Sequence, residues 1–214
     1  MSYDGGPHKK IHQLFPVSVW EYKLDEDDMW MSEQALEFCK TLEMNMYNFP
    51  AGVRTSRGNI HKDPEMEPLM GFFADALDEI RCAQALQCHE LKISLSWANL
   101  APRGSNTGHP IHRHNYSYLS GVYYFTDGAP TTFWDPLNIR NEDTLEIIRD
   151  HINPTQEIIT AEPGKLLVFP GWLKHQSGPH NGSEDRWSMS FNSLPNGAVN
   201  AGPQGIPMAN ITVN

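Results

Sequence analysis

The sequence is poor in cysteine and in basic residues. Its three cysteines, Cys39, Cys82 and Cys88, are odd in number and form no CxxC pair. This pattern argues against a disulfide framework or a cysteine-zinc knuckle and favours a reducing compartment. Lysine and arginine number 16 against 26 aspartates and glutamates, so the formal net charge is −10. Because surfaces that bind nucleic acid are basic, this balance argues against a nucleic-acid partner.

Long hydrophobic runs, secretion signals and repeats are also missing. No apolar stretch approaches the ~20 residues of a membrane-spanning helix. Residues 1–15 lack the apolar core of a secretion signal. We therefore expect a cytoplasmic protein with no membrane partner. The 214 residues suffice for one domain with its own core, and we expect a single domain over residues 1–214.

Hydrophobic periodicity predicts one strand and two helices, followed by a series of short strands. The first strand falls within Phe15–Leu24, and the acidic run Asp25–Asp28 starts a helix that continues to about Leu42. A second helix begins near Asp63-Pro64 and extends to about Leu86. Asn141 is expected to cap a short helix. The later strands are predicted at Leu91–Leu100, Leu119–Phe125, Thr131–Trp134, Thr155–Ala161, Lys165–Phe169 and Trp187–Phe191.

This order of elements predicts a mostly β fold of the α+β class. It argues against alternating βαβ units and favours an antiparallel sandwich or jelly roll with N-terminal helices packed on one face. Residues 25–90 would supply the helical support and residues 90–193 the jelly-roll core. The tail over residues 194–214 is rich in Gly, Pro and Asn, and we expect it to be irregular.

The stretch HPIHRHNYSYLSGVYYFTD, from His109 to Asp127, carries the first chemical signal. His112 and His114 are two residues apart, and on an extended backbone such side chains point to one face, as metal ligands must. His109 is three residues from His112, so we expect it in a loop or on the substrate side. An HxH pair alone is a weak signal, because histidines also serve as ordinary surface or core residues.

The second signal lies in GKLLVFPGWLKH and DRWSMSFN. His175 follows a buried strand that ends at Pro170-Gly171, from where it could swing back inward. Arg186 and Ser188 share one face of the next strand, and the planar guanidinium suits a carboxylate. The alternative is a surface arginine paired with Asp185 or Glu184. His180 lies in a polar loop and is expected to be exposed.

Together these residues resemble the iron(II)- and 2-oxoglutarate-dependent oxygenases of the double-stranded β-helix fold. The specific resemblance is to a family from marine bacteria and phages, through HxH followed by LSGVYYF, PGKLLVFPGWLKH and RWSMSFN. LFPVSVW and SWANL are also similar, so the likeness covers nearly the whole chain and is sharpest over residues 95–192. It implies Fe(II) and 2-oxoglutarate as cofactor and co-substrate. The implied reaction hydroxylates a C–H bond of a small molecule or protein side chain, with release of succinate and CO₂.

Carried over by residue, the resemblance implies His112, His114 and His175 as metal ligands. Arg186, Ser188 and Tyr124 would hold the distal carboxylate of 2-oxoglutarate, with Tyr123 as the fallback for Tyr124. Trp97 and Asn99 would line the pocket.

His114 departs from the wider superfamily, which has Asp or Glu at this position. Three neutral ligands leave the iron–2-oxoglutarate complex without the negative charge that a carboxylate would add. Alternatively, His114 does not ligate and leaves a position for water, halide or another group. Asp127 or Asp135 is a further alternative as a distant third ligand, but their spacing does not support it.

Two rival functions remain open. A three-histidine site with one open position also describes a zinc-dependent hydrolase, although that function leaves Arg186 and Ser188 unexplained. A non-catalytic jelly-roll binding module, with the histidines merely filling a pocket, is the other rival.

Overall fold

The computed structural model describes residues 16–45, 52–136, 155–201 and 205–214. The N-terminal part contains strand β1 (Trp20–Lys23), helix α1 (Met29–Thr41), the short strand β2 (Arg54–Thr55) and helix α2 (Glu67–Ala83). The helix expected after Asn141 lies outside the described residues. The remaining strands are β3 (Glu90–Ala101), β4 (Leu119–Tyr124), β5 (Gly128–Trp134), β6 (Gln156–Ala161), β7 (Lys165–Pro170), β8 (His175–Ser177), β9 (Arg186–Ala201) and β10 (Pro207–Ile211).

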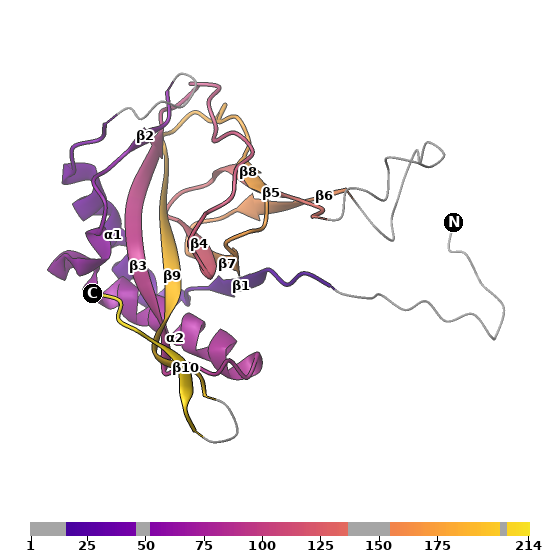
Figure 1. Cartoon of the computed structure of the whole chain (residues 1–214). Coiled ribbons are helices and arrows are strands. Elements are labelled where there is room, and N and C mark those ends of the chain that lie inside the picture. The colour runs from indigo at the N-terminus through magenta and orange to yellow at the C-terminus, as the bar shows by residue number, and fades with distance from the viewer. Residues whose placement is uncertain (1–15, 46–51, 137–154, 202–204) are drawn as a thin grey trace, which may run out of the picture.

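Two antiparallel sheets form the body of the protein. The larger sheet runs in the order β1-β7-β4-β9-β3-β2, with β10 attached to β9, and the smaller sheet runs β6-β5-β8. Figure 1 shows α1 and α2 on one side of the larger sheet and the smaller sheet on the other. This is the predicted jelly roll with helices on one face. Among the described helices, none is long and apolar enough to cross a membrane.

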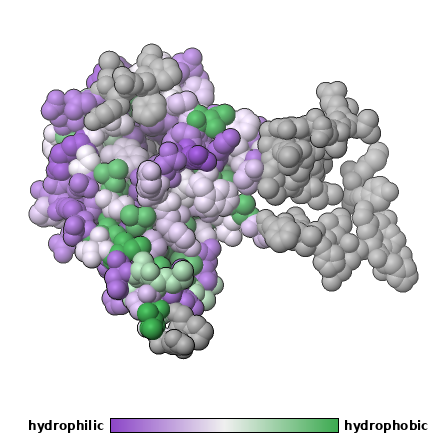
Figure 2. Space-filling model, viewed as in Figure 1, coloured by the Kyte–Doolittle hydropathy of each residue, from purple (hydrophilic) through white to green (hydrophobic). Residues whose placement is uncertain are grey.

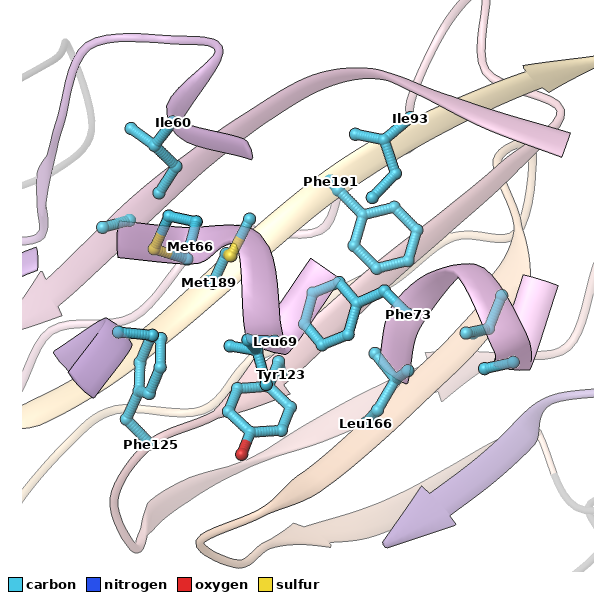
Figure 3. Close-up of a cluster of buried hydrophobic side chains, with 14 of the residues drawn as sticks. Ile60, Met66, Leu69, Phe73, Ile93, Tyr123, Phe125, Leu166, Met189 and Phe191 are labelled. Carbon is cyan, nitrogen blue, oxygen red and sulfur yellow. The ribbon is translucent and has the colours of Figure 1, made fainter. Parts of the chain in front are cut away.

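The apolar stripe of α2 packs on the outer face of the larger sheet. Phe73 is fully buried there, with its ring centroid 5.4 Å from that of Tyr123 and 5.3 Å from that of Phe191 (Figure 3). Leu69 and Leu166 belong to the same cluster. The predicted helical face thus anchors the sheet from outside, which leaves the inner face free to line a site.

Alternate side chains of β9 point to opposite faces of the larger sheet. Trp187, Met189 and Phe191 belong to the core cluster under α2. The intervening side chains, from Arg186 to Asn192, line a cavity of about 540 Å³ between the sheets. One strand therefore contributes both to the core and to the cavity wall, because successive side chains of a strand point to opposite faces.

The prediction of an irregular tail was wrong. β9 continues past Leu194 to Ala201 and pairs with β10, with Ile211 opposite Gly197. The Gly, Pro and Asn content hid this hairpin, since the pairing partner rather than local propensity decides such a strand. Figure 2 shows a mostly hydrophilic surface in this view, with apolar side chains gathered near the hairpin. Met208 is 82% exposed there.

Candidate metal centre and anion pocket

The main chains of His112 and His175 are joined in an isolated antiparallel bridge. The His112 amide donates to the His175 carbonyl over 2.9 Å, and the His175 amide donates back over 3.0 Å. His175 is also paired with Phe133 at the edge of the smaller sheet. The bridge therefore places the first histidine of the HxH pair beside the third histidine.

His112, His114 and His175 converge on one point. One ligand nitrogen from each lies within 4.8 Å of the other two, slightly more than the span of two metal–nitrogen bonds of about 2.1 Å. The HxH segment is not a regular strand beyond the bridge at His112. The three residues nevertheless form the only such cluster of His, Cys, Asp or Glu in the described ranges.

Each histidine has a carbonyl oxygen at its Nδ1 atom. His112 Nδ1 lies 2.8 Å from the carbonyl oxygen of Pro110, and His175 Nδ1 lies 2.9 Å from that of Leu173. The third acceptor is the side-chain oxygen of Asn192, at His114 Nδ1. Because a carbonyl only accepts, it favours a proton on Nδ1 and leaves the Nε2 lone pair for a metal.

The Nε2 atoms fit a metal for a second reason. Those of His112 and His114 lie 3.3 Å apart. With both Nδ1 atoms protonated, two lone pairs face each other at this distance, and a cation between them would turn that repulsion into attraction. The donor set therefore suits a divalent ion such as iron or zinc.

Burial favours the neutral form of His175 and His114. It lowers the pKa of His175 to about 3, and the neighbouring His112 lowers it further in the same direction. Burial also lowers the pKa of His114. Since a histidine ligates metal only in its neutral form, the site is prepared for metal at neutral pH.

Arg186 has no anionic partner among the residues that the structure describes. Its side chain lies in the same cavity, the residue is only 3% exposed, and its Nε has no hydrogen-bond partner. No carboxylate of the described residues forms an ion pair with it, so the alternative of a surface pair with Asp185 or Glu184 does not hold. A buried guanidinium is costly unless an anion binds it, and the forked donors match a carboxylate.

Tyr124, Ser188 and Thr131 surround the arginine. The guanidinium carbon lies 5.6 Å from the centre of the Tyr124 ring, and the Tyr124 hydroxyl lies 2.6 Å from Thr131 Oγ. Ser188 is paired with Tyr124 in the sheet and is 2% exposed. Tyr123 instead packs under α2, so strand parity selects Tyr124 as the tyrosine on the cavity side.

The predicted lining residues are also in the cavity wall. Trp97 stacks on His114 with ring centroids 5.8 Å apart. Asn99 donates to Ser190 Oγ over 3.0 Å, and its own Oδ1 is buried without a partner. His109 lines the cavity as well, and burial lowers its pKa to about 4.

The expectation that His180 is exposed was wrong. Its residue is 3% exposed, and its ring nitrogen Nε2 lies 2.7 Å from the carbonyl oxygen of Glu184. An isolated bridge joins His180 to Thr107, which lies in the segment after β3, and a reading of local polarity does not reveal this long-range contact.

Asn192 contacts the ligand candidate His114, whereas Ser190 is bonded to Asn99 in the cavity wall, and the sequence reasoning assigned neither. Both continue the two-residue spacing that starts at Arg186 and Ser188, so the alternation of RWSMSFN contains the signal. Thr131 was missed because it comes from the opposite sheet.

The cavity therefore holds three converging imidazoles and, as far as the described residues go, an arginine with no carboxylate partner. Residues 95–192 match the family model described as "Putative 2OG-Fe(II) oxygenase". This segment is therefore similar to the 2OG-Fe(II) oxygenases, which are oxidoreductases that use Fe(II) and 2-oxoglutarate. The matched segment contains every ligand candidate and the arginine, so the resemblance found from the sequence is confirmed. A search of curated protein sequences found no match to this chain.

Solved structures confirm the double-stranded β-helix fold. The epimerase SnoN from nogalamycin biosynthesis aligns with a TM-score of 0.64 and 12% identity, over 92% of this chain and 91% of its own. The carbocyclase SnoK from the same biosynthesis gives 0.62 and 14%, over 91% and 90%. HygX from Streptomyces hygroscopicus, with nickel, 2-oxoglutarate and hygromycin B bound, gives 0.59 and 12%, over 92% and 93%. At these identities the likeness is one of fold.

Proposed function

We propose that this protein is a dioxygenase that hydroxylates an unactivated C–H bond of a small molecule or protein side chain. With Fe(II) bound, the cofactor would couple oxidative decarboxylation of 2-oxoglutarate to this hydroxylation, with release of succinate and CO₂. The observation that carries the proposal is the buried, unpaired Arg186 in the same cavity as three converging imidazoles.

The chain's own residues would divide the work. His112, His114 and His175 would hold the metal through their Nε2 atoms. Arg186, with the hydroxyls of Ser188 and Tyr124, would hold the distal carboxylate of 2-oxoglutarate. Arg186 begins one face of β9, and Asn192, which contacts His114, lies farther along the same face. This arrangement would fix the co-substrate between metal and guanidinium and leave its reactive end at the metal.

The volume of the cavity supports a small substrate. A cavity of about 540 Å³ is within the range of pockets that enclose small molecules, so 2-oxoglutarate and a small substrate or an inserted side chain would both fit. The three unpaired cysteines support a cytoplasmic location. We further propose that residues 1–214 form one domain, because α1 and α2 pack on the sheet that carries the site.

Two measurements test the function. Purified protein with Fe(II), ascorbate and 2-oxoglutarate should form succinate, even slowly without substrate. Under anaerobic conditions, Fe(II) and 2-oxoglutarate together should give a visible charge-transfer band that neither gives alone. A protein that binds the metal but never gives this band or succinate would contradict the proposal and favour the zinc hydrolase.

A substitution at Arg186 distinguishes the oxygenase from the zinc hydrolase directly. Arg186→Ala should weaken 2-oxoglutarate binding while metal binding stays intact. Arg81→Ala is the matched control, since Arg81 pairs with Asp78 on α2, away from the cavity. If Arg186→Ala binds 2-oxoglutarate as tightly as the wild type, the assigned clamp is wrong.

A further inference from the structure

The three histidines differ in the kind of oxygen that lies at the Nδ1 atom. The Nδ1 atoms of His112 and His175 face main-chain carbonyl oxygens, which no substitution of a side chain removes. The Nδ1 atom of His114 faces the side-chain oxygen of Asn192. His114 is thus the one ligand candidate whose tautomer depends on another residue's side chain.

Asn192 is itself held in place. Its Oδ1 also accepts a hydrogen bond from Ser120 Oγ over 3.1 Å, and Ser120 is fully buried. Two donors at one oxygen oppose a flip of the carboxamide, because a flip would turn the amide N–H groups toward them. Trp97 stacks on the other side of the His114 ring, so hydrogen bonding and packing fix the ring together.

The tautomer decides whether His114 can ligate. With the proton on Nδ1, donated to Asn192, the Nε2 lone pair points toward the Nε2 atom of His112 at 3.3 Å. With the proton on Nε2, that atom would donate a hydrogen bond to His112 Nε2 instead, and it would occupy the space a metal needs. Only the first state offers three lone pairs to one ion.

We propose that Asn192 is a positioning residue that fixes the Nδ1–H tautomer of His114 and thereby makes it the third metal ligand. The inference rests on the proposed function, since it assigns a role within the same metal centre. It explains how an uncharged residue can take the place that a carboxylate fills in related sites. It also means that an acidic residue at position 192 would place a negative charge next to His114 without replacing the ligand itself.

Cobalt(II) is the probe for the test, because its visible absorption reports coordination and it does not require turnover. The affinity and the visible spectrum are measured for wild type, Asn192→Leu and Asn192→Asp. Loss of an outer-shell partner typically costs about 10–100-fold in metal affinity, so we expect that loss and an altered spectrum in Asn192→Leu. Asn192→Asp keeps the acceptor and adds charge, so it should bind at least as tightly as wild type.

Ser190→Ala is the matched control. Ser190 lies on the same face of β9, two residues away, and contacts Asn99 rather than a histidine. Its loss should leave the cobalt affinity and spectrum unchanged. Normal binding by Asn192→Asp and Ser190→Ala would show that the strand still folds when these positions change.

A double-mutant cycle with His114→Ala completes the test. If Asn192 acts through His114, Asn192→Leu should add little to the affinity already lost in His114→Ala. Equal and additive losses, or a wild-type spectrum and affinity in Asn192→Leu, would overturn the inference. Wild-type protein that binds no divalent metal would instead contradict the proposed function itself.

Discussion

Gly171 lies directly against the main chain at Ser117, so closely that an added Cβ would collide with the Ser117 carbonyl oxygen. The Gly171 carbonyl accepts from the His114 amide over 2.8 Å, and the Gly171 amide donates to Tyr118 over 3.1 Å. The turn before His175 and the segment after the HxH pair are therefore fastened together at a residue without a side chain. This close approach keeps the two ligand-bearing segments at a fixed distance.

Gly171→Ala should separate these segments. The obstructing atom belongs to the main chain and cannot rotate away, so we expect a loss of about 1–3 kcal/mol in the free energy of unfolding and weaker cobalt(II) binding. The control is Gly71→Ala on α2, where an added Cβ meets nothing within 4 Å. That change should stabilise the helix by up to about 1 kcal/mol. Denaturant unfolding and metal titration measure both effects, and unchanged metal binding in Gly171→Ala would contradict the expectation.

Arg186→Met should raise stability and abolish the response to 2-oxoglutarate. The guanidinium is buried and no described residue supplies it with an anion, so an apolar replacement of similar length removes a desolvation cost. A gain of about 1 kcal/mol would raise the unfolding midpoint of ligand-free protein by about 2–4 °C. Added 2-oxoglutarate should raise the midpoint of metal-loaded wild type and not that of the variant. A variant that unfolds at a lower temperature would show that the arginine already has a stabilising partner.

Tyr124→Phe and Tyr123→Phe form a matched pair on adjacent positions of β4. Tyr124 faces Arg186 and Thr131, whereas Tyr123 packs under α2. Loss of a hydrogen bond worth about 1 kcal/mol should weaken 2-oxoglutarate binding roughly fivefold in Tyr124→Phe, with no change in Tyr123→Phe. Titration of the anaerobic charge-transfer band gives both affinities. If Tyr123→Phe weakened 2-oxoglutarate binding and Tyr124→Phe did not, the two side chains of β4 would point to the opposite faces from those assigned.

The metal-free protein should lose stability as the pH falls below about 6.5. Burial lowers the pKa of His175 to about 3, while in the unfolded chain it is about 6.5. Between these two values the unfolded state binds more protons than the folded state, so stability rises with pH in this window and is constant above it. His175→Gln cannot titrate, so its stability should fall less between pH 7 and pH 4. Urea unfolding across this range checks the difference, and parallel curves would contradict it.

Local patterns in the sequence were sufficient for most of the framework. The apolar stripe of α2 and the alternation of RWSMSFN depend only on the geometry of a helix and a strand, and both were predicted from residue spacing. The same spacing correctly placed Arg186 and Ser188 on one face. The hairpin of β9 and β10 was missed because strand pairing depends on residues distant along the chain, and the Gly and Pro content suggested a loop.

The sequence by itself determined which side chains share a face and which residue types a metal or a carboxylate would need. Only the tertiary structure decided that His112 meets His175 across a main-chain bridge, that Tyr124 rather than Tyr123 lies beside Arg186, and that Asn192 contacts His114. The physical reason is the difference between local and long-range interactions. The direction of a side chain along a strand follows from the chain's local geometry. The distance between two such side chains depends instead on how the sheets close around the cavity, which is set by the packing of the whole domain.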